Sequence, residues 1–358
     1  LLSRGVRLWT SGKAGRFMLR AWGSPALVAV LVVGLVAATV AAGEPASANG
    51  DGTHAPAPPG APKVLVIVVD TLRADHLPAY GYARGSTPHL DRFAEDAVRY
   101  EQAFANASWT RPSFASILTG RYARSHGVMG KSDALADDVV TLAEALRANG
   151  YATHGWVTNF NVNAHYNFQQ GFDTYRFIEP DNVLWADDTA IKLLLMQTVR
   201  RGYETLNARL GRVHPGTIYQ DAEVVNGEVF AFLERAPTDQ PWFAFVGYMD
   251  PHDPYFPHPY DGTGYARAAH QSPDLAEADR LRALYDGEIT YWDEHFGRLI
   301  AELQRRGVYD DTMIIVTSDH GEEFERFSIS RIDSRWLSSR GTSLRPLTDL
   351  VFMSYPPK

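Results

Sequence analysis

The sequence contains no cysteine in its 358 residues. This absence excludes a disulfide framework, a thiolate zinc site and a cysteine nucleophile, and it removes the usual clue to the redox compartment. A basic excess is also missing: the formal net charge is -8, and it becomes -13 without the first 25 residues, which carry five basic and no acidic side chains. We therefore expect no nucleic-acid partner. What is present, 45% apolar and 21% charged residues, is typical of a globular protein.

One uncharged apolar run, residues 26–42, approaches the length of a membrane span. As a helix it would be roughly 25 Å long, which is borderline for crossing a bilayer. The basic residues before it and the small residues after it are typical of a secretion signal or an uncleaved signal anchor over residues 1–45. The alternative is a buried helix of the fold.

We interpret residues 46–62 as a linker, because the second half of this segment is rich in proline and alanine. The positive-inside bias of the N-terminus places the rest of the chain outside the cytoplasm. The sequence therefore predicts a periplasmic or extracellular protein, anchored to the membrane if the N-terminal segment is not cleaved.

From residue 63 onward, segments with strand and helix patterns alternate. Near-continuous apolar runs are typical of strands that are buried on both faces of a parallel sheet. Such runs lie at Val64–Val69 and Met313–Val316, and Tyr151–Val157 and Trp242–Val246 are also predicted to be strands. Helical spacing predicts helices that start at Thr87–Pro88, cover Val139–Arg147, include Val225–Leu233 and cover Leu281–Leu303. This alternation predicts an α/β domain over residues 63–358, a three-layer α/β/α sandwich with a mainly parallel central sheet.

Residues 181–219 interrupt the alternation. We interpret this segment as a helical insertion that packs on the domain. The alternative is a basic amphipathic helix that rests on a lipid surface.

Two of the predicted strands end in an aspartate. Asp70 follows the first strand, and Asp319 and His320 follow the strand that contains Met313–Val316. Ligands of parallel sheets gather outside the carboxyl ends of the strands, so these three side chains are expected to share one crevice. Carboxylate oxygens together with an imidazole suit a divalent cation. The sequence therefore predicts a metal site.

Thr110 lies just before Pro112, which suits the first turn of a helix that would run through Leu118. The free amides and the dipole at such a helix start favour an anion. A hydroxyl placed there beside a cation could be activated as a nucleophile, although a threonine in this position alone is more often a helix cap.

Six ordered motifs resemble the sulfatase family of the alkaline phosphatase superfamily, which includes sulfatases, phosphodiesterases and phosphoglycerol or phosphoethanolamine transferases. The motifs span roughly residues 63–325, and they are VVDTLRADHL, TPHLDRFAEDAVRYEQAFA, SWTRPSFASILTGRY with the following SHG, PHDPYFP, YDGEITYWDEHFGRLI and IIVTSDHGEEF. The resemblance implies an alkaline-phosphatase-like fold. Residues 63–358 would then be the catalytic domain without the smaller C-terminal subdomain of such enzymes.

The resemblance implies a role for each matching residue. Asp70, Asp319 and His320 would bind one divalent metal ion, with the oxygen of Thr110 completing the ligand set. Thr110 stands at the position of the family's nucleophile, and His252 matches a histidine that contacts the substrate and protonates the leaving group. Calcium is expected for sulfatases, whereas His320 favours manganese or zinc.

The departures from the family pattern affect the expected chemistry. Sulfatases carry a cysteine or serine that is oxidised to formylglycine, and threonine cannot form that aldehyde. Phe114 stands where their motif has an arginine, and Asn159 lies near the place of a substrate-binding lysine. Arg340 is the candidate for a basic substrate-binding residue near the C-terminus, against a solvated loop arginine.

The resemblance and its departures predict a metal-dependent enzyme that cleaves phosphate esters of small molecules, lipids or glycans through a phosphothreonine intermediate. Water would complete the reaction in a hydrolase and an acceptor hydroxyl in a transferase. Two alternatives are a sulfuric ester hydrolase and an inactive, membrane-tethered binding module.

Overall fold

The computed structural model describes residues 56–181, 215–237, 240–261, 265–266 and 275–324, the backbone of 348–349 and 351–354, and two isolated positions, 202 and 206. The chain divides into two compact units, and all described residues except these two isolated positions belong to the unit made of Ser47–Asp181 and Gly211–Lys358. The predicted signal segment 1–45, most of the 181–219 insertion and Arg340 lie outside the described residues. No described helix combines the length and apolar character needed to cross a membrane.

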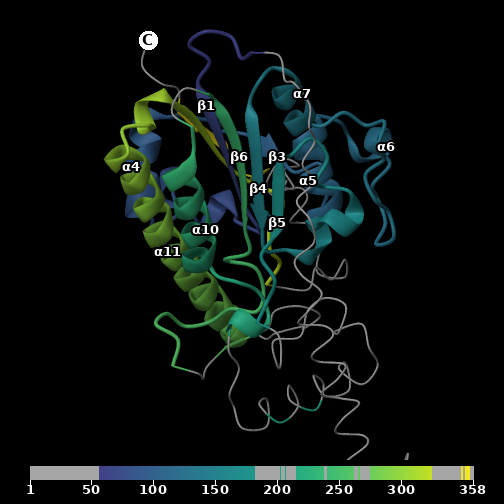
Figure 1. The fold of residues 1–358 in the computed structure, drawn as a ribbon. Coiled ribbons are helices and arrows are strands. Elements are labelled where there is room, and N and C mark those ends of the chain that lie inside the picture. Colours follow the sequence, from purple (N-terminus) through teal and green to yellow (C-terminus); the bar gives the residue numbers. More distant parts are fainter. Residues whose placement is uncertain are drawn as a thin grey trace, which may run out of the picture. The chain divides into compact units, whose positions relative to one another are not determined.

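A mainly parallel sheet forms the centre of this unit (Figure 1). Its described strands lie in the order β2-β9-β7-β1-β6-β4-β5, in which the five from β7 to β5 are parallel and β9 and β2 are antiparallel additions. The bounds are β1 (Lys63–Val69), β2 (Val98–Arg99), β4 (Ala152–Val157), β5 (Thr174–Phe177), β6 (Trp242–Tyr248), β7 (Thr312–Ser318) and β9 (Val351–Ser354). Strands β3 (Ala103–Phe104) and β8 (Thr348–Asp349) form a separate antiparallel pair.

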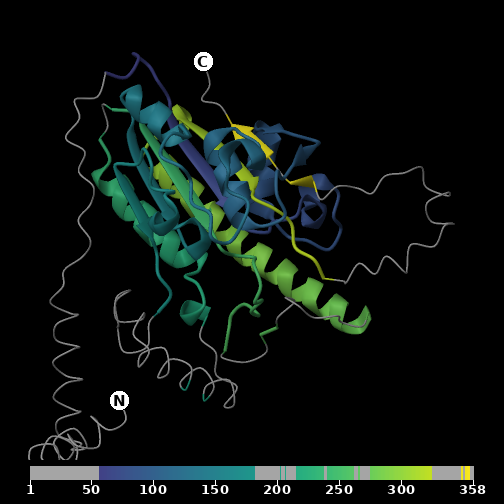
Figure 2. The same ribbon diagram turned by 90° about the vertical axis from the view of Figure 1, so that its right-hand side faces the viewer.

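Helices cover both faces of the sheet, as Figures 1 and 2 show. One face carries α4 (Pro88–Asp96), α10 (Ala222–Arg235) and α11 (Leu275–Arg305), and the other carries α5 (Thr110–Thr119), α6 (Ala123–His126) and α7 (Leu142–Ala148). Short 3-10 helices connect these elements: η1 (Ala74–His76), η2 (Pro78–Tyr80), η3 (Phe160–Val162), η4 (Ala164–Tyr166), η6 (Pro215–Thr217) and η7 (Tyr309–Asp311). The predicted three-layer α/β/α sandwich is confirmed.

Strand β1 shows why this sequence forms the middle layer. Leu65, Ile67 and Val69 belong to the core under α10 and α11, whereas Val66 and Val68 belong to the core under α5 and α7. Successive side chains of a strand point to opposite faces, so a continuous apolar run fills both cores at once.

Helix α4 starts at Pro88, as the sequence predicted, and α11 packs against it. The Thr87 hydroxyl does not cap α4 but donates to the Asp91 side chain (3.2 Å). The cap comes from α11, where the buried carboxylate of Asp293 accepts hydrogen bonds from the amides of His89 (3.0 Å) and Leu90 (2.8 Å). A Cβ atom on Gly297 would lie 2.4 Å from the His89 ring, so glycine permits this close approach.

Helix α7 starts later than the predicted Val139. Thr141 and Glu144 form a capping box, in which the Thr141 hydroxyl accepts from the Glu144 amide (3.1 Å) and the Glu144 carboxylate accepts from the Thr141 amide (2.8 Å). This reciprocal pair fixes the helix start at Leu142, because it satisfies amides that have no partner inside the helix.

Candidate metal centre and nucleophile

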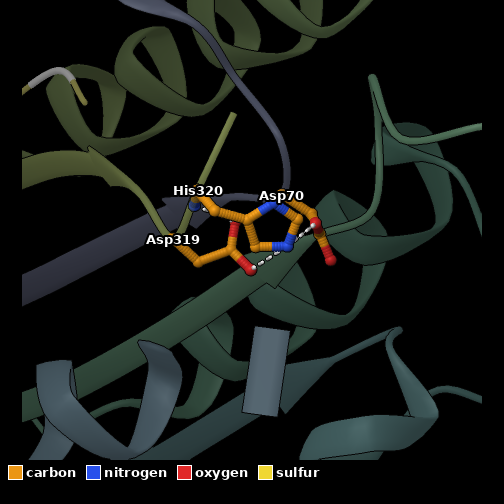
Figure 3. A group of neighbouring side chains, drawn as sticks. All are labelled: Asp70, Asp319 and His320. Carbon is orange, nitrogen blue, oxygen red and sulfur yellow. Dashed lines mark hydrogen bonds and ion pairs between the residues drawn. The ribbon is translucent and has the colours of Figure 1, made fainter. Parts of the chain in front are cut away.

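Asp70, Asp319 and His320 come together at the carboxyl edge of the sheet (Figure 3). Strands β1 and β7 are parallel neighbours, and their register pairs Val69 with Ser318. Asp70 and Asp319, which directly follow these strands, are therefore adjacent in space although they are far apart in sequence. One ligand atom from each of the three side chains lies within 4.8 Å of the others. The predicted convergence of these residues is present in the structure.

The backbone after Asp70 turns sharply to bring this about. Thr71 has a left-handed φ of 58°, which is unusual for a β-branched residue. Its amide donates to Asp319 Oδ1 (3.1 Å), which also accepts from the His320 amide (2.8 Å). Oδ1 of Asp319 therefore holds the two strand ends together, and Oδ2 remains for a ligand.

The electrostatics of the three side chains fit a cation. Asp70 Oδ1 and Asp319 Oδ2 are buried and accept no hydrogen bond from any described residue. Burial and the nearby charge of Asp70 raise the pKa of Asp319. Burial alone would lower the pKa of His320, but the carboxylates of Asp319 and Asp70 outweigh burial and raise it. Two buried carboxylate oxygens without donors are costly unless a positive charge compensates them, which a divalent ion would do.

The orientation of the His320 ring also suits a metal ligand. Its Nδ1 donates to the carbonyl of Gly321 (2.8 Å), which leaves Nε2 directed at the two aspartates, 3.4 Å from Asp319 Oδ2 and 3.7 Å from Asp70 Oδ1. Metal-ligating histidines commonly donate their other ring nitrogen to such a carbonyl, because this fixes the tautomer and the ring orientation.

Thr110 is the first residue of α5, and Pro112 lies in the first turn of this helix, as the sequence predicted. Its buried hydroxyl oxygen lies 3.4 Å from His320 Nε2. The first turn of α5 is docked on the end of β7, because the Ser113 hydroxyl donates to the Asp319 carbonyl. This contact holds the Thr110 hydroxyl beside the metal-ligand cluster.

Asn159 connects the nucleophile candidate to the cluster. It follows β4, and its side-chain amide donates to Asp70 Oδ2 (2.6 Å) and to Thr110 Oγ1 (3.3 Å). Its Oδ1 accepts from the Asn161 amide (2.9 Å), which fixes the orientation of the side chain. Asn159 is thus a neutral donor where the family pattern has a charged lysine nearby.

Arg111 is a neighbour of the site that the sequence did not indicate. Its side chain is almost fully buried, donates to the carbonyl and side-chain oxygens of Asn161 (3.0 and 3.1 Å), and lies over the Tyr166 ring. It joins the start of α5 to the segment that carries Asn159. Arginine is rarely fully buried, so sequence alone would have placed Arg111 on the surface.

His252 lies beyond the carboxyl end of β6, the other neighbour of β1. Its Nδ1 donates to the Asp253 carbonyl (2.6 Å), so Nε2 is the nitrogen available to a substrate. Burial would lower the pKa of His252, but the negative charges of Asp70 and Glu322 raise it above the ordinary value. Those negative charges favour a protonated imidazole.

Helix α11 holds the segment that follows Asp70. The buried Tyr285 hydroxyl donates to the Thr71 carbonyl (2.6 Å) and accepts from the Arg73 amide (2.9 Å). The Arg73 guanidinium in turn donates to the Glu322 carbonyl (2.6 Å), two residues after His320. These bonds stabilise the unusual backbone of Thr71.

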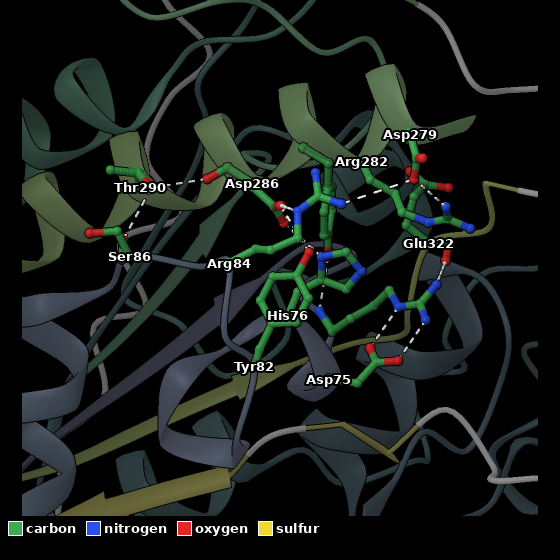
Figure 4. Close-up of polar contacts among 12 residues, drawn as sticks. Asp75, His76, Tyr82, Arg84, Ser86, Asp279, Arg282, Asp286, Thr290 and Glu322 are labelled. Carbon is green, nitrogen blue, oxygen red and sulfur yellow. Dashed lines mark hydrogen bonds and ion pairs between the residues drawn. The ribbon is translucent and has the colours of Figure 1, made fainter. Parts of the chain in front are cut away.

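A second contact of α11 lies next to Tyr285. Asp286 accepts from the Tyr82 hydroxyl (2.9 Å) and lies 2.7 Å from His76 Nδ1, as Figure 4 shows. The turn from Asp70 to Tyr82 is therefore fixed against α11 at several points.

Comparisons with known proteins agree with this architecture. The sequence model of the family described as Sulfatase matches residues 62–347. The ulvan-active sulfatase of Formosa agariphila is 26% identical over 282 residues, which cover 74% of this chain and 51% of that protein. A multifunctional alkaline phosphatase superfamily protein of Trinickia caryophylli is 27% identical over 331 residues, covering 73% and 63%. The chain thus spans about half to two thirds of the length of these relatives.

Among solved structures, the phosphonate monoester hydrolase of Agrobacterium radiobacter has the same fold, with a TM-score of 0.59 at 22% identity over 82% of this chain and 68% of that one. This fold and the family match over most of the sequence lead to one assignment. The chain belongs to the sulfatase family.

Proposed function

We propose that this chain is the catalytic region of a metal-dependent enzyme that cleaves phosphate esters through a phosphothreonine at Thr110. The observation that carries the proposal is the position of the Thr110 hydroxyl. It is buried at the start of α5, within 3.4 Å of His320 Nε2 and of the Asn159 amide. We further propose that the chain acts outside the cytoplasm, on the basis of its N-terminal sequence.

Asp70, Asp319 and His320 would hold one divalent ion, with manganese, zinc and calcium as candidates. The orphaned oxygens of the two aspartates support this assignment. A bound cation supplies positive charge that lowers the pKa of the Thr110 hydroxyl and offsets the charge of the transferring group.

The chain's own residues supply the remaining steps. Thr110 Oγ1, its proton lost to solvent, forms a bond to phosphorus while the bond to the leaving oxygen breaks, and that oxygen takes the electron pair. The free amides of α5 stabilise the negative charge on the other phosphoryl oxygens. His252 Nε2 gives the leaving oxygen its proton. Water, or an acceptor hydroxyl, then attacks phosphorus, the bond from phosphorus to Thr110 Oγ1 breaks, and the proton of the attacking oxygen returns to His252.

Sulfate ester cleavage is the second candidate, because the relative from Formosa agariphila is named a sulfatase. Such an activity would have to use the unmodified Thr110 hydroxyl. A panel of p-nitrophenyl phosphomonoester, phosphodiester and sulfate ester, measured with each metal, separates the two candidates. Metal binding without turnover of any ester would support the third interpretation, a binding module.

The phosphothreonine is the sharpest test of the proposal. With a slow phosphodiester and acid quenching, we expect mass spectrometry to find a phosphate on Thr110. Thr110→Ala should lower turnover at least about a thousandfold, because no nucleophile replaces the hydroxyl.

Thr119→Ala is the matched control. Thr119 is the last residue of α5, and its hydroxyl donates within the helix to the Ala115 carbonyl (2.6 Å), so this variant should remain active. Substantial phosphodiesterase activity in a folded Thr110→Ala variant would contradict the proposal.

A further inference from the structure

The segment that carries His252 is fixed by a buried carboxylate that the mechanism does not use. Residues 250–261, the His252 loop, follow β6, and Glu288 of α11 contacts this loop twice. One carboxylate oxygen accepts from the Phe256 amide (2.5 Å), and the other lies 2.7 Å from His258 Nε2. The Glu288 side chain is completely buried.

His258 is itself held in place by α11. Its ring stacks on Tyr291, with ring centroids 4.0 Å apart and planes 9° apart. Nε2 of this stacked ring points at Glu288, so His258 donates to the carboxylate. The loop is thus attached to α11 by one backbone bond, one side-chain bond and one ring contact.

Further contacts leave His252 between two fixed points. On the β6 side, the His252 amide donates to the Met249 carbonyl (2.7 Å). On the other side, Tyr255 pairs with Ala266 in an antiparallel bridge, and Tyr255 and Phe256 are fully buried. The Asp253 amide adds a long contact to Glu322 Oε2 (3.4 Å), and the firmest attachment on this side of His252 is the one by which α11 holds Phe256.

Burying a carboxylate to hold a loop in place costs free energy of desolvation, which an apolar side chain of similar size would avoid. Burial raises the pKa of Glu288, and its contacts with His258 and the Phe256 amide oppose that rise. What the carboxylate provides, and an apolar residue does not, is a directional contact to both the backbone and a side chain of the loop.

We propose that Glu288, together with His258, is a positioning residue that sets the placement of His252 toward the leaving group. This inference rests on the proposed function, in which His252 gives its proton to the departing oxygen. Neither residue touches the substrate. Their effect is confined to the bond-breaking step, in which the electron pair of the cleaved bond moves to the leaving oxygen.

Hydrogen exchange tests the positioning without any substrate. Glu288→Met keeps the approximate size of the side chain and removes both acceptors, and His258→Phe keeps the stack on Tyr291 and removes the donor. The matched control is Asp293→Leu, which removes a buried carboxylate from the same helix, where it holds two amides of α4. We expect amides of the His252 loop to exchange at least about tenfold faster in Glu288→Met than in the control. Equal exchange in the two variants would overturn the inference.

A series of aryl esters with different leaving phenols tests the chemical consequence. Unsubstituted phenolate is more basic than p-nitrophenolate, so its departure depends more strongly on protonation of the leaving oxygen. We therefore expect Glu288→Met and His258→Phe to lower kcat/KM about 10- to 100-fold for the phenyl ester and less than about threefold for the p-nitrophenyl ester. Asp293→Leu should affect both esters equally.

The double variant Glu288→Met with His252→Ala should be no slower than His252→Ala alone, because both changes act through the same proton. Equal losses on good and poor leaving groups, or no loss on either, would overturn the inference. The inference would also be overturned if His252→Ala lowered kcat/KM equally for the phenyl and the p-nitrophenyl ester. That result would not affect the role proposed for Thr110. Failure of the proposed phosphate chemistry is read separately, from the Thr110 phosphate, and the same series can be run with sulfate esters.

Discussion

Among single residues, Asn159 shows how the site balances its charges. Its amide group donates to the Asp70 carboxylate at 2.6 Å and faces Thr110 at 3.3 Å. A neutral donor here satisfies one carboxylate oxygen and adds no positive charge that would compete with a cation. The side chain therefore supports both the metal ligand and the nucleophile candidate.

Replacement of Asn159 by aspartate should make the metal-free protein less stable. The change removes the donor from a buried oxygen of Asp70 and sets two carboxylates against each other, so we expect a loss of at least about 1–3 kcal/mol in the free energy of unfolding. A divalent ion should restore more stability to the variant than to the wild type.

Urea unfolding with and without chelator measures both effects. Asn163→Asp is the matched control, because the Asn163 side chain accepts from the His165 amide (2.9 Å), which aspartate can also do. An Asn159→Asp variant as stable as the wild type without metal would contradict this interpretation of the site.

Helix α11 is the element that organises the site from behind the sheet. Tyr285 and Asp286 hold the turn after Asp70, and Glu288 holds the His252 loop. One turn further along, Asp293 caps α4. The polar residues of this helix thus fix the loops, while its apolar residues fill the core.

Asp293 should make stability depend on pH. Burial raises the pKa of Asp293 to about 6, although the amides of His89 and Leu90 oppose that rise. A carboxyl group whose pKa is raised in the folded state contributes stability below its unfolded pKa, ordinarily 3.8, and loses that contribution as the pH rises through about 6. The wild type should therefore lose up to about 3 kcal/mol relative to Asp293→Asn between pH 4 and pH 7.

The difference between the two unfolding free energies, measured in urea at several pH values, tests this expectation. Asp310→Asn, at an exposed position, should show no such trend. A constant difference between wild type and Asp293→Asn across the range would mean that Asp293 ionises as freely in the folded protein as in the unfolded chain.

For the whole molecule, the candidate metal centre lies between strands that are distant in sequence. Asp70 and Asp319 are separated by most of the domain, and each has one buried oxygen that accepts no hydrogen bond from a described residue at the β1–β7 edge. A cation bound there would connect the two halves of the sheet. Its removal should therefore affect stability as well as activity.

Chelation should lower the melting temperature and abolish turnover, and an added divalent ion should restore both. At a free ion concentration of one hundred times Kd, the stabilisation would be about 2.7 kcal/mol. Thermal unfolding in the presence of chelator, manganese, zinc or calcium measures the effect and ranks the metals. Asp70→Asn should abolish the metal-dependent shift, whereas Asp75→Asn, an exposed change nearby, should keep it. If the melting temperature stayed the same with chelator and with each of the three ions, this result would argue against a metal centre.

Sequence patterns by themselves determined the layers of the fold and the convergence of Asp70, Asp319 and His320. Both follow from local rules: a continuous apolar run fills two cores, and parallel neighbours end at one edge of the sheet. The tertiary structure alone decided that α5 starts at Thr110, that Asn159 contacts both Asp70 and Thr110, and that Arg111, Glu288 and Asp293 are buried. The physical reason is that each of these features depends on a hydrogen bond or contact between segments distant in the chain, and no local pattern reveals which polar group will find its partner across the fold.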